Sequence, residues 1–255
     1  MKKSKSRYKK DQLFSAPKES VDAFHFDETV TEVFHDMIQR SVPGYGTILP
    51  FIGLIAAEYA QDNTTLYDLG CSLGAATLSM RHQVTAKACN IVAVDNSEAM
   101  VSRCIENMSK DDTSFPVSVH CEEIQQTHIN NASVVVVNLV LQFIAIHERA
   151  TLLKKIYTGM NPGGILILSE KLHFDDDHHQ NDKNSENQIQ THLHHAFKRA
   201  QGYSNLEISQ KRSALENVLI PESLDVHLSR LKKSGFSQAF VWFQCFNFSS
   251  IIAIK

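Results

Sequence analysis

The sequence predicts an α/β fold built on a mostly parallel sheet, and three observations predict it. A short apolar strand runs into a glycine turn and then a helix, over residues 66–77. A second apolar strand, residues 91–94, ends in Asp95. Further strands alternate with helical patterns along the chain, which is typical of a parallel sheet with crossover helices. Since no internal repeat or Gly/Ser-rich linker interrupts it, we expect residues 13–255 to form a single domain.

The glycine turn predicts a ligand-binding loop. Gly70 and Gly74 lack a Cβ, so the backbone can bend sharply and a ligand can lie against its N–H groups. The Gly-x-x-x-Gly spacing is not the three-glycine dinucleotide fingerprint, and no Gly-Lys-Ser/Thr follows, as a phosphate loop requires. Asp95 stands about twenty residues further on, where doubly wound folds place a carboxylate that binds ribose hydroxyls. A nucleoside without a phosphate chain fits both observations.

Composition excludes several classes of protein. The chain has 255 residues, of which 43% are hydrophobic, so it can bury the core of one large globular domain. A formal net charge of −3 argues against direct binding of nucleic acid by bulk electrostatics. No apolar run approaches the roughly twenty residues that span a bilayer, so no membrane is expected. The five scattered cysteines are typical of reduced thiols in a cytoplasmic protein.

The N-terminal part predicts a tail and two lid helices. Residues 1–12 begin with a basic run and are expected to be disordered, with contact to nucleic acid as the alternative interpretation. Asp27 is a candidate N-cap for a helix with apolar residues at helical spacing, and an apolar helix follows from about 48 to 59. Between these lid helices, which cover about 27–60, Tyr45 lies in a break. It either contacts the ligand or belongs to a plain turn.

The remaining elements follow the alternating pattern. Asn96 and Ser97 cap a helix after the second strand, and Asn138 ends a valine-rich strand at the sheet edge where open α/β sheets hold ligands. A helical insertion over about 175–220 begins with an exposed, histidine-rich loop, and Ser204 and Glu207 form a capping box within it. The other expected segments are strands at 116–120, 133–137 and 165–169, a turn at 161–164, helices at 190–200, 206–218 and 222–233, and an antiparallel strand pair at 238–246 and 248–254.

Neither a metal site nor a nucleophile is indicated. The thirteen histidines include pairs at helical spacing, but no carboxylate or cysteine stands beside them in a ligand pattern, so no metal is expected. Cys71 lies at a helix N-terminus, where a thiol can be activated. A small residue whose amide contacts the ligand is the alternative role, and we favour it.

Several segments together resemble a known family. The strand, glycine turn and following acid are similar to the first motif of class I S-adenosylmethionine-dependent methyltransferases. Six runs carry a closer resemblance to the carboxy-S-adenosyl-L-methionine synthase family, and the ones around Tyr45, Arg212 and Cys245 are the most specific. These runs are residues 13–17, 36–45, 67–79, 161–164, 206–213 and 242–248.

The resemblance implies a fold, a reaction and a set of partners. The fold is the Rossmann-like class I methyltransferase fold, with a mostly parallel seven-stranded sheet, an antiparallel C-terminal edge and added lid helices. The reaction converts S-adenosyl-L-methionine and prephenate to carboxy-S-adenosyl-L-methionine and phenylpyruvate, without a metal. The product serves a tRNA carboxymethyltransferase that builds 5-oxyacetyluridine at the wobble position. A cytoplasmic homodimer is also implied.

The resemblance also implies the site residues. The catalytic residues are Tyr45 and Arg212. The residues that contact S-adenosyl-L-methionine are Tyr45, Gly70, Cys71, Ser72, Asp95, Asn96, Glu123, Ile124, Asn138 and Arg212.

Two departures from the family pattern are local. Glu123 stands where the family has Asp, and His35 stands where it has Pro. The histidine-rich stretch 175–189 is an insertion relative to the family.

Arg212 distinguishes between chemistries on physical grounds. A guanidinium beside a sulfonium cation is repulsive in a dry pocket, so an ordinary methyltransferase has little use for it. A carboxylate on the transferred carbon would give Arg212 a planar anion to bind with two hydrogen bonds. The alternative is a surface arginine paired with Glu207 or Glu216. An ordinary methyltransferase acting on a small acceptor, or a non-catalytic module that binds S-adenosylmethionine, stay open as other functions.

Overall fold

The computed structural model describes residues 9–174 and 185–255. The strands are β1 (Thr65–Leu69), β2 (Asn90–Asp95), β3 (Val117–Cys121), β4 (Ala132–Asn138), β5 (Met160–Lys171), β6 (Gln238–Cys245) and β7 (Phe248–Ile254). The helices are α1 (Glu28–Ser41), α2 (Tyr45–Tyr59), α3 (Ala75–Gln83), α4 (Glu98–Ser109), the 3₁₀ turn η1 (Leu141–Phe143), α5 (Ile146–Gly159), α6 (Glu186–Ala200), α7 (Asn205–Leu215) and α8 (Leu224–Ser234).

The strands form one seven-stranded sheet in the order β3-β2-β1-β4-β5-β7-β6. The first five strands of this order are parallel, and β7 is antiparallel to both β5 and β6. The predicted antiparallel C-terminal edge is therefore confirmed. Strand order reverses between β1 and β4, and open α/β sheets bind ligands beyond the carboxyl ends of the strands at such a point.

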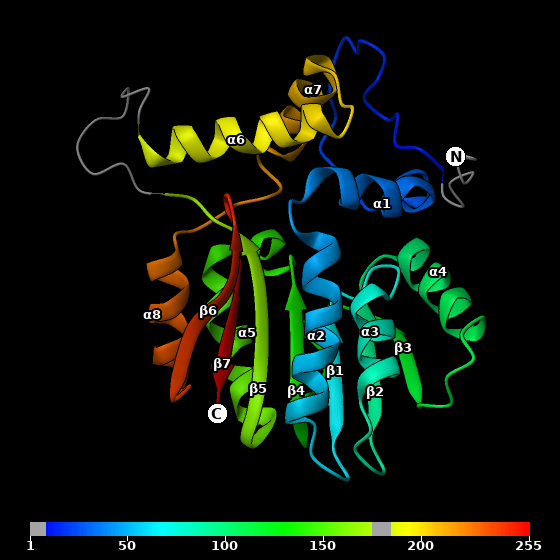
Figure 1. Cartoon of the computed structure of the whole chain (residues 1–255), viewed down its shortest axis with the longest axis vertical. Coiled ribbons are helices and arrows are strands. Elements are labelled where there is room, and N and C mark those ends of the chain that lie inside the picture. The colour runs from blue at the N-terminus through cyan, green and yellow to red at the C-terminus, as the bar shows by residue number, and fades with distance from the viewer. Residues whose placement is uncertain (1–8, 175–184) are drawn as a thin grey trace, which may run out of the picture.

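Helices cover both faces of the sheet (Figure 1). On β4, side chains alternate between the two faces, because successive residues of a strand point in opposite directions. Val134 and Val136 pack with α2 and α3, whereas Val135 and Val137 pack with α5. All four valines are fully buried, which explains why this strand reads as a continuous apolar run.

A third layer lies across the carboxyl ends of the parallel strands. It contains α1, α6 and α7, which Figure 1 shows at the top of the molecule. The side chain of Asp27 caps α1 by accepting the N–H of Val30 at 2.8 Å, and the Ser204/Glu207 capping box opens α7, both as predicted. This layer closes a cavity over the edge of the sheet.

Three predicted boundaries were wrong. Helix α2 begins at Tyr45, not near residue 48, because Gly44 adopts φ 81° and turns the chain directly into the helix. The turn expected at 161–164 is an irregular part of β5: Ala132 pairs with Met160 and Val134 with Ile165, so the extra residues bulge from the ladder. Helix α7 ends at Leu215, because the chain then turns and the N–H of Ile220 donates to the carbonyl of Gln142.

The two segments expected to be irregular fall largely outside the described residues. This is true of residues 1–8 of the expected tail and of 175–184 in the histidine-rich stretch. Within the rest of the expected tail, Asp11 is buried, accepts a hydrogen bond from the Tyr203 hydroxyl and donates its N–H to Asp36. Of the helices in the described ranges, none has the length and apolar character needed to cross a membrane.

Candidate active site

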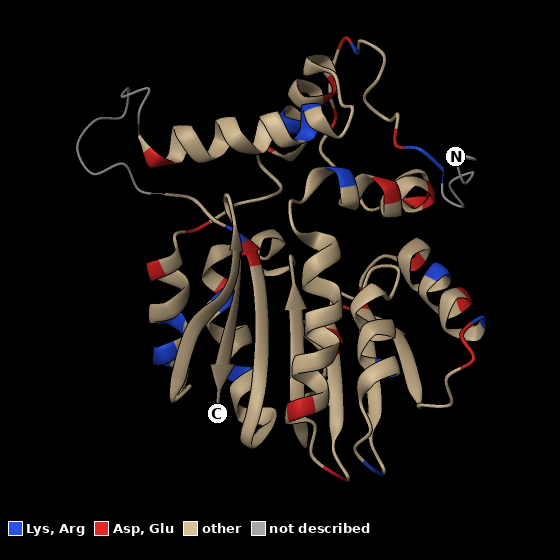
Figure 2. Cartoon of the chain, in the orientation of Figure 1, with Lys and Arg blue, Asp and Glu red and all other residues tan. Residues whose placement is uncertain are grey.

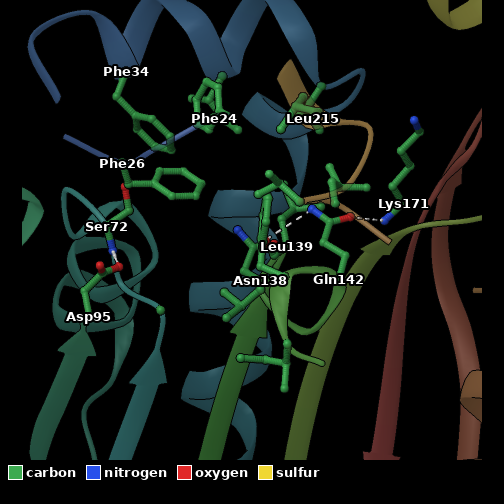
Figure 3. Close-up of a pocket in the computed structure, with 18 of the residues that line it drawn as sticks. Phe24, Phe26, Phe34, Ser72, Asp95, Asn138, Leu139, Gln142, Lys171 and Leu215 are labelled. Atoms are coloured by element: carbon green, nitrogen blue, oxygen red, sulfur yellow. Dashed lines mark hydrogen bonds between the residues drawn. The ribbon is translucent and has the colours of Figure 1, made fainter. Parts of the chain in front are cut away.

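A cavity of about 570 Å³ lies between the carboxyl ends of the strands and the third layer (Figure 3). Its floor is formed by the ends of β1, β2 and β4 and the loops that follow them. Its roof is formed by α1, α6, α7 and the segment before α1. Nine of the ten predicted site residues line it: Tyr45, Gly70, Cys71, Ser72, Asp95, Asn96, Glu123, Ile124 and Asn138.

Asp95 holds the glycine loop in place. One carboxylate oxygen accepts the N–H of Ser72 at 2.9 Å, and the other accepts the N–H of Ser97 at 3.0 Å. Gly70 adopts φ +83°, and a Cβ there would lie 2.3 Å from a methyl carbon of Val140, so only glycine fits. Burial raises the pKa of Asp95, although these N–H groups act in the opposite direction. A carboxylate with spare lone pairs thus faces the cavity.

Asp68, Tyr45 and Cys71 form a buried part of the floor. The hydroxyl of Thr77 donates to Asp68 at 2.6 Å, and burial raises the pKa of Asp68 to about 6. Burial, with Asp68 nearby, also raises the pKa of Tyr45, which keeps its hydroxyl protonated. The thiol of Cys104 and burial raise the pKa of Cys71 well above its usual value. Because a protonated thiol is a weak nucleophile, this geometry favours the small-residue role for Cys71.

Asn138 leaves an acceptor free inside the cavity. Its side-chain oxygen is buried and has no hydrogen-bond partner among the described residues. Since buried polar atoms are normally paired, this oxygen is available to accept a hydrogen bond from a donor in the cavity. Asn96 and Glu123 also line the cavity and are exposed, and the Asn96 amide donates to both carboxylate oxygens of Glu123, at 3.1 and 3.3 Å. The longer Glu123 side chain is thereby engaged with Asn96.

Arg212 is the predicted site residue that does not line this cavity. It lies on α7 and is exposed. Burial is the main cause of the lowered pKa of Lys171 and of His195, and the positive charge of Arg212 adds to both shifts. The surface pairing with Glu207 or Glu216 is absent from the ion pairs of the described residues.

Sequence reasoning missed two groups of lining residues. One is aromatic: Phe24, Phe26, Phe34 and Phe143 form edge-to-face contacts over the loop end of the floor. The other is basic: Lys171, Lys198 and Lys211 line the roof and its border with β5. A signal for Lys211 was present, because it lies three residues from both Ile208 and Ala214, on the buried face of α7.

Within residues 9–174 and 185–255, no group of three or more histidine, cysteine, aspartate or glutamate side chains could hold a metal ion. The lining of the cavity offers carboxylates, amides, lysines and aromatic rings.

The fold, the glycine loop and the acid at the end of β2 define a class I S-adenosylmethionine-dependent methyltransferase fold. A family model described as a methyltransferase domain matches residues 66–164. A putative S-adenosylmethionine-dependent methyltransferase from Methanococcus maripaludis superposes with a TM-score of 0.59 at 18% identity, over 93% of this chain and 97% of that one. A putative O-methyltransferase from Nostoc punctiforme gives 0.61 at 14% identity, over 89% and 59%.

Sequence similarity over the whole chain identifies the family. A carboxy-S-adenosyl-L-methionine synthase of Trichlorobacter lovleyi is 57% identical over 97% of this chain and 99% of its own length. The corresponding proteins of Geobacter sp. strain M21 and Shewanella piezotolerans are 54% and 53% identical, over 97% and 96% of this chain and 99% and 98% of theirs. The chain belongs to the carboxy-S-adenosyl-L-methionine synthase family, and it is an enzyme.

Proposed function

We propose that this enzyme converts S-adenosyl-L-methionine and prephenate to carboxy-S-adenosyl-L-methionine and phenylpyruvate. The observation that carries the proposal is identity of 53–57% to synthases of that name over nearly the whole chain. The cavity adds physical support, because it combines a nucleoside-type floor with a basic roof. The product supplies the carboxymethyl donor for 5-oxyacetyluridine at the tRNA wobble position.

The floor fits S-adenosylmethionine as a substrate. Asp95 is placed to accept the ribose hydroxyls, and the unpaired oxygen of Asn138 can accept a hydrogen bond from the ammonium group of the methionine part. Ile124 is buried beside Glu123 at the rim and provides an apolar surface for the adenine. The acids of the floor also favour a cationic sulfonium over a neutral ligand.

The proposed reaction needs confinement more than acid and base groups. Prephenate loses its ring carboxyl as carbon dioxide and its hydroxyl as hydroxide. The hydroxide removes a proton from the sulfonium methyl and becomes water, and the resulting ylide bonds to the carbon dioxide. Holding the fragments together and excluding bulk water are the contributions expected of the aromatic and apolar walls.

The assembly proposed for this reaction is a homodimer in the cytoplasm, which hands its product to a tRNA carboxymethyltransferase and does not itself bind tRNA. The exposed position of Arg212 outside the cavity of its own chain supports a role for its guanidinium at the site of a second copy. In that role it binds the new carboxylate of the product. No direct contact with a membrane is part of the proposal.

Mass spectrometry tests this function directly. Purified enzyme is incubated with S-adenosylmethionine, with and without prephenate, and the small molecules are analysed. We expect a nucleoside heavier than the substrate by one carbon dioxide only when prephenate is present. Transfer of a labelled methyl group to an acceptor would instead establish an ordinary methyltransferase, and binding without any turnover would establish a binding module.

A further inference from the structure

The roof of the cavity holds an unusual concentration of buried positive charge. Lys198 on α6 and Lys211 on α7 are only 9% and 7% exposed, and both line the cavity together with Lys171 at the end of β5. Figure 2 shows basic residues gathered where the C-terminal end of α6 meets α7, and Figure 3 shows Lys171 across the cavity from Asp95. Lysines are almost never this buried without a partner of opposite charge.

These lysines lack such a partner among the described residues. The side chains of Lys171 and Lys198 form no hydrogen bond or ion pair with the described part of the chain, and the ammonium of Lys211 donates to the Ser41 hydroxyl at 3.0 Å. Burial, reinforced by Lys211 and Lys171, lowers the pKa of Lys198 to about 7. Burial likewise lowers the pKa of Lys211 to about 8, and Asp11 opposes this shift. The native fold alone therefore does not stabilise the charges.

S-adenosylmethionine brings no net negative charge to the cavity. Its amino acid part carries one ammonium and one carboxylate, and its sulfonium adds a further positive charge. The floor, which S-adenosylmethionine occupies under the proposed function, contains Asp68 and Asp95, and Figure 3 shows Lys171 on the side of the cavity away from Asp95. A second ligand that is an anion would balance the charge at the roof and hold the lysines in their protonated form.

We propose that Lys171, Lys198 and Lys211 form a binding site for the carboxylates of the second substrate, an aromatic or cyclohexadiene dicarboxylate. This inference rests on the proposed function, because it assigns a place to the second substrate of that reaction. The lysines supply ammonium donors for two carboxylates, and they orient the ring toward the sulfonium side of the cavity.

The surroundings of the lysines match such a ligand. Phe248 lines the cavity beside them and lies edge-on to His194, with ring centroids 5.1 Å apart. The Nε2 of His194 donates to the carbonyl of Ser41 at 2.8 Å, and burial lowers the pKa of His194, so this ring stays neutral and apolar in character. A ligand with a six-membered ring and anionic ends thus finds an apolar contact and cations together.

Calorimetric titration tests the site independently of turnover. Prephenate and phenylpyruvate are titrated into enzyme saturated with S-adenosylhomocysteine, for the parent and for Lys198→Met and Lys171→Met. Methionine keeps the length of the side chain but removes its charge. Arg199→Met is the matched control, because it removes an exposed positive charge one position away on the same helix. Thermal unfolding of each variant reports whether the fold is kept.

The expected result separates binding from folding. Each lysine variant should bind prephenate and phenylpyruvate roughly 10- to 100-fold more weakly than the parent. The affinity of each lysine variant for S-adenosylhomocysteine should stay at the parental value. Arg199→Met should bind all three ligands with parental affinity. Lys198→Met should unfold at the same or a higher temperature, because it removes a buried charge without a protein partner. If one variant fails to fold, the other still decides the question, since Lys171 is less buried than Lys198.

Three results would overturn the assignment. One is parental carboxylate affinity in both lysine variants. Another is weaker binding of S-adenosylhomocysteine with unchanged binding of prephenate and phenylpyruvate, which would assign the lysines to the carboxylate of the amino acid part. The third is a parent enzyme that binds neither carboxylate. Failure of the proposed function is a different observation, namely carboxylate binding without any carboxylated nucleoside in the mass spectrum.

Discussion

The floor and the roof of the cavity carry opposite charge, and they differ in how that charge is held. On the floor, Asp95 is fixed by the N–H groups of Ser72 and Ser97, and Asp68 by the hydroxyl of Thr77. On the roof, Lys171 and Lys198 have no anionic partner in the described part of the chain. The two acids of the floor thus have hydrogen-bond donors from the protein itself, whereas the roof lysines would gain an anionic partner only from the proposed ligand.

This difference in charge would allow one cavity to bind the two proposed substrates, one a cation and the other an anion. A cation is favoured over the acids and an anion beside the lysines, so each substrate is directed to its own side. Bringing a sulfonium methyl close to a source of carbon dioxide is the central requirement of the proposed reaction. The comparison between floor and roof can be tested by substituting a residue on one side and measuring ligand binding at both sides.

The largest effect is expected from Asp95→Ala on the floor. This change removes the acceptor proposed for the ribose hydroxyls and the acceptor of the N–H groups of Ser72 and Ser97, so the affinity for S-adenosylmethionine should fall by about 100-fold or more. Carboxylate binding at the roof should persist. Calorimetry of both ligands measures the two sides. Asp112→Ala, an exposed carboxylate before β3, should match the parent.

A smaller effect is expected from Arg212→Ala. Loss of a guanidinium that binds the new carboxylate should lower the rate of product formation by roughly 30-fold. Binding of S-adenosylmethionine should be unchanged or slightly tighter, because one positive charge is removed. Steady-state assays by mass spectrometry measure this, with exposed Lys233→Ala as the control. If Arg212→Ala forms product at the parental rate and binds the product with unchanged affinity, the proposed catalytic role of Arg212 is wrong.

The roof also predicts a stability that depends on pH. The pKa of Lys198 is about 7 in the native protein against an ordinary 10.5, so between these values the unfolded chain binds more protons than the native protein. The free energy of unfolding of the parent should then rise with pH across this window, relative to Lys198→Met. Urea unfolding should give a larger free energy of unfolding for Lys198→Met than for the parent at about pH 6, and a smaller difference between the two proteins at about pH 9.5. A difference in the free energy of unfolding that grows as the pH rises would contradict the lowered pKa of Lys198.

The smallest effect is expected from Glu123→Asp at the rim. The shorter side chain should lose part of its pairing with the Asn96 amide, which is an exposed interaction, so the affinity for S-adenosylmethionine should change by less than about fivefold. The same calorimetric titration measures it. A loss as large as that of Asp95→Ala would show that Glu123 is a principal part of the floor.

Most of the floor could be predicted from the sequence because its residues are local to strand ends. Gly70, Cys71 and Ser72 follow β1 directly, Asp95 and Asn96 end and follow β2, and Asn138 ends β4. In a parallel sheet these ends meet at one edge, so the spacing of motifs along the chain determines their position in space. The helix N-caps Asp27 and Ser204 could also be predicted from the sequence, because a cap depends only on residues up to three positions away in the chain.

The roof required the tertiary structure. Lys171 ends a strand, Lys198 lies near the end of one helix and Lys211 lies within the next, and each alone looks like an ordinary surface lysine. Their burial depends on how α1, α6 and α7 pack over the sheet, which is a property of long-range contacts and not of local pattern. By itself the sequence determined the sheet, the glycine loop and the family. Only the packing of the third layer decided which charges are removed from water, because desolvation depends on what covers a side chain and not on its neighbours in the chain.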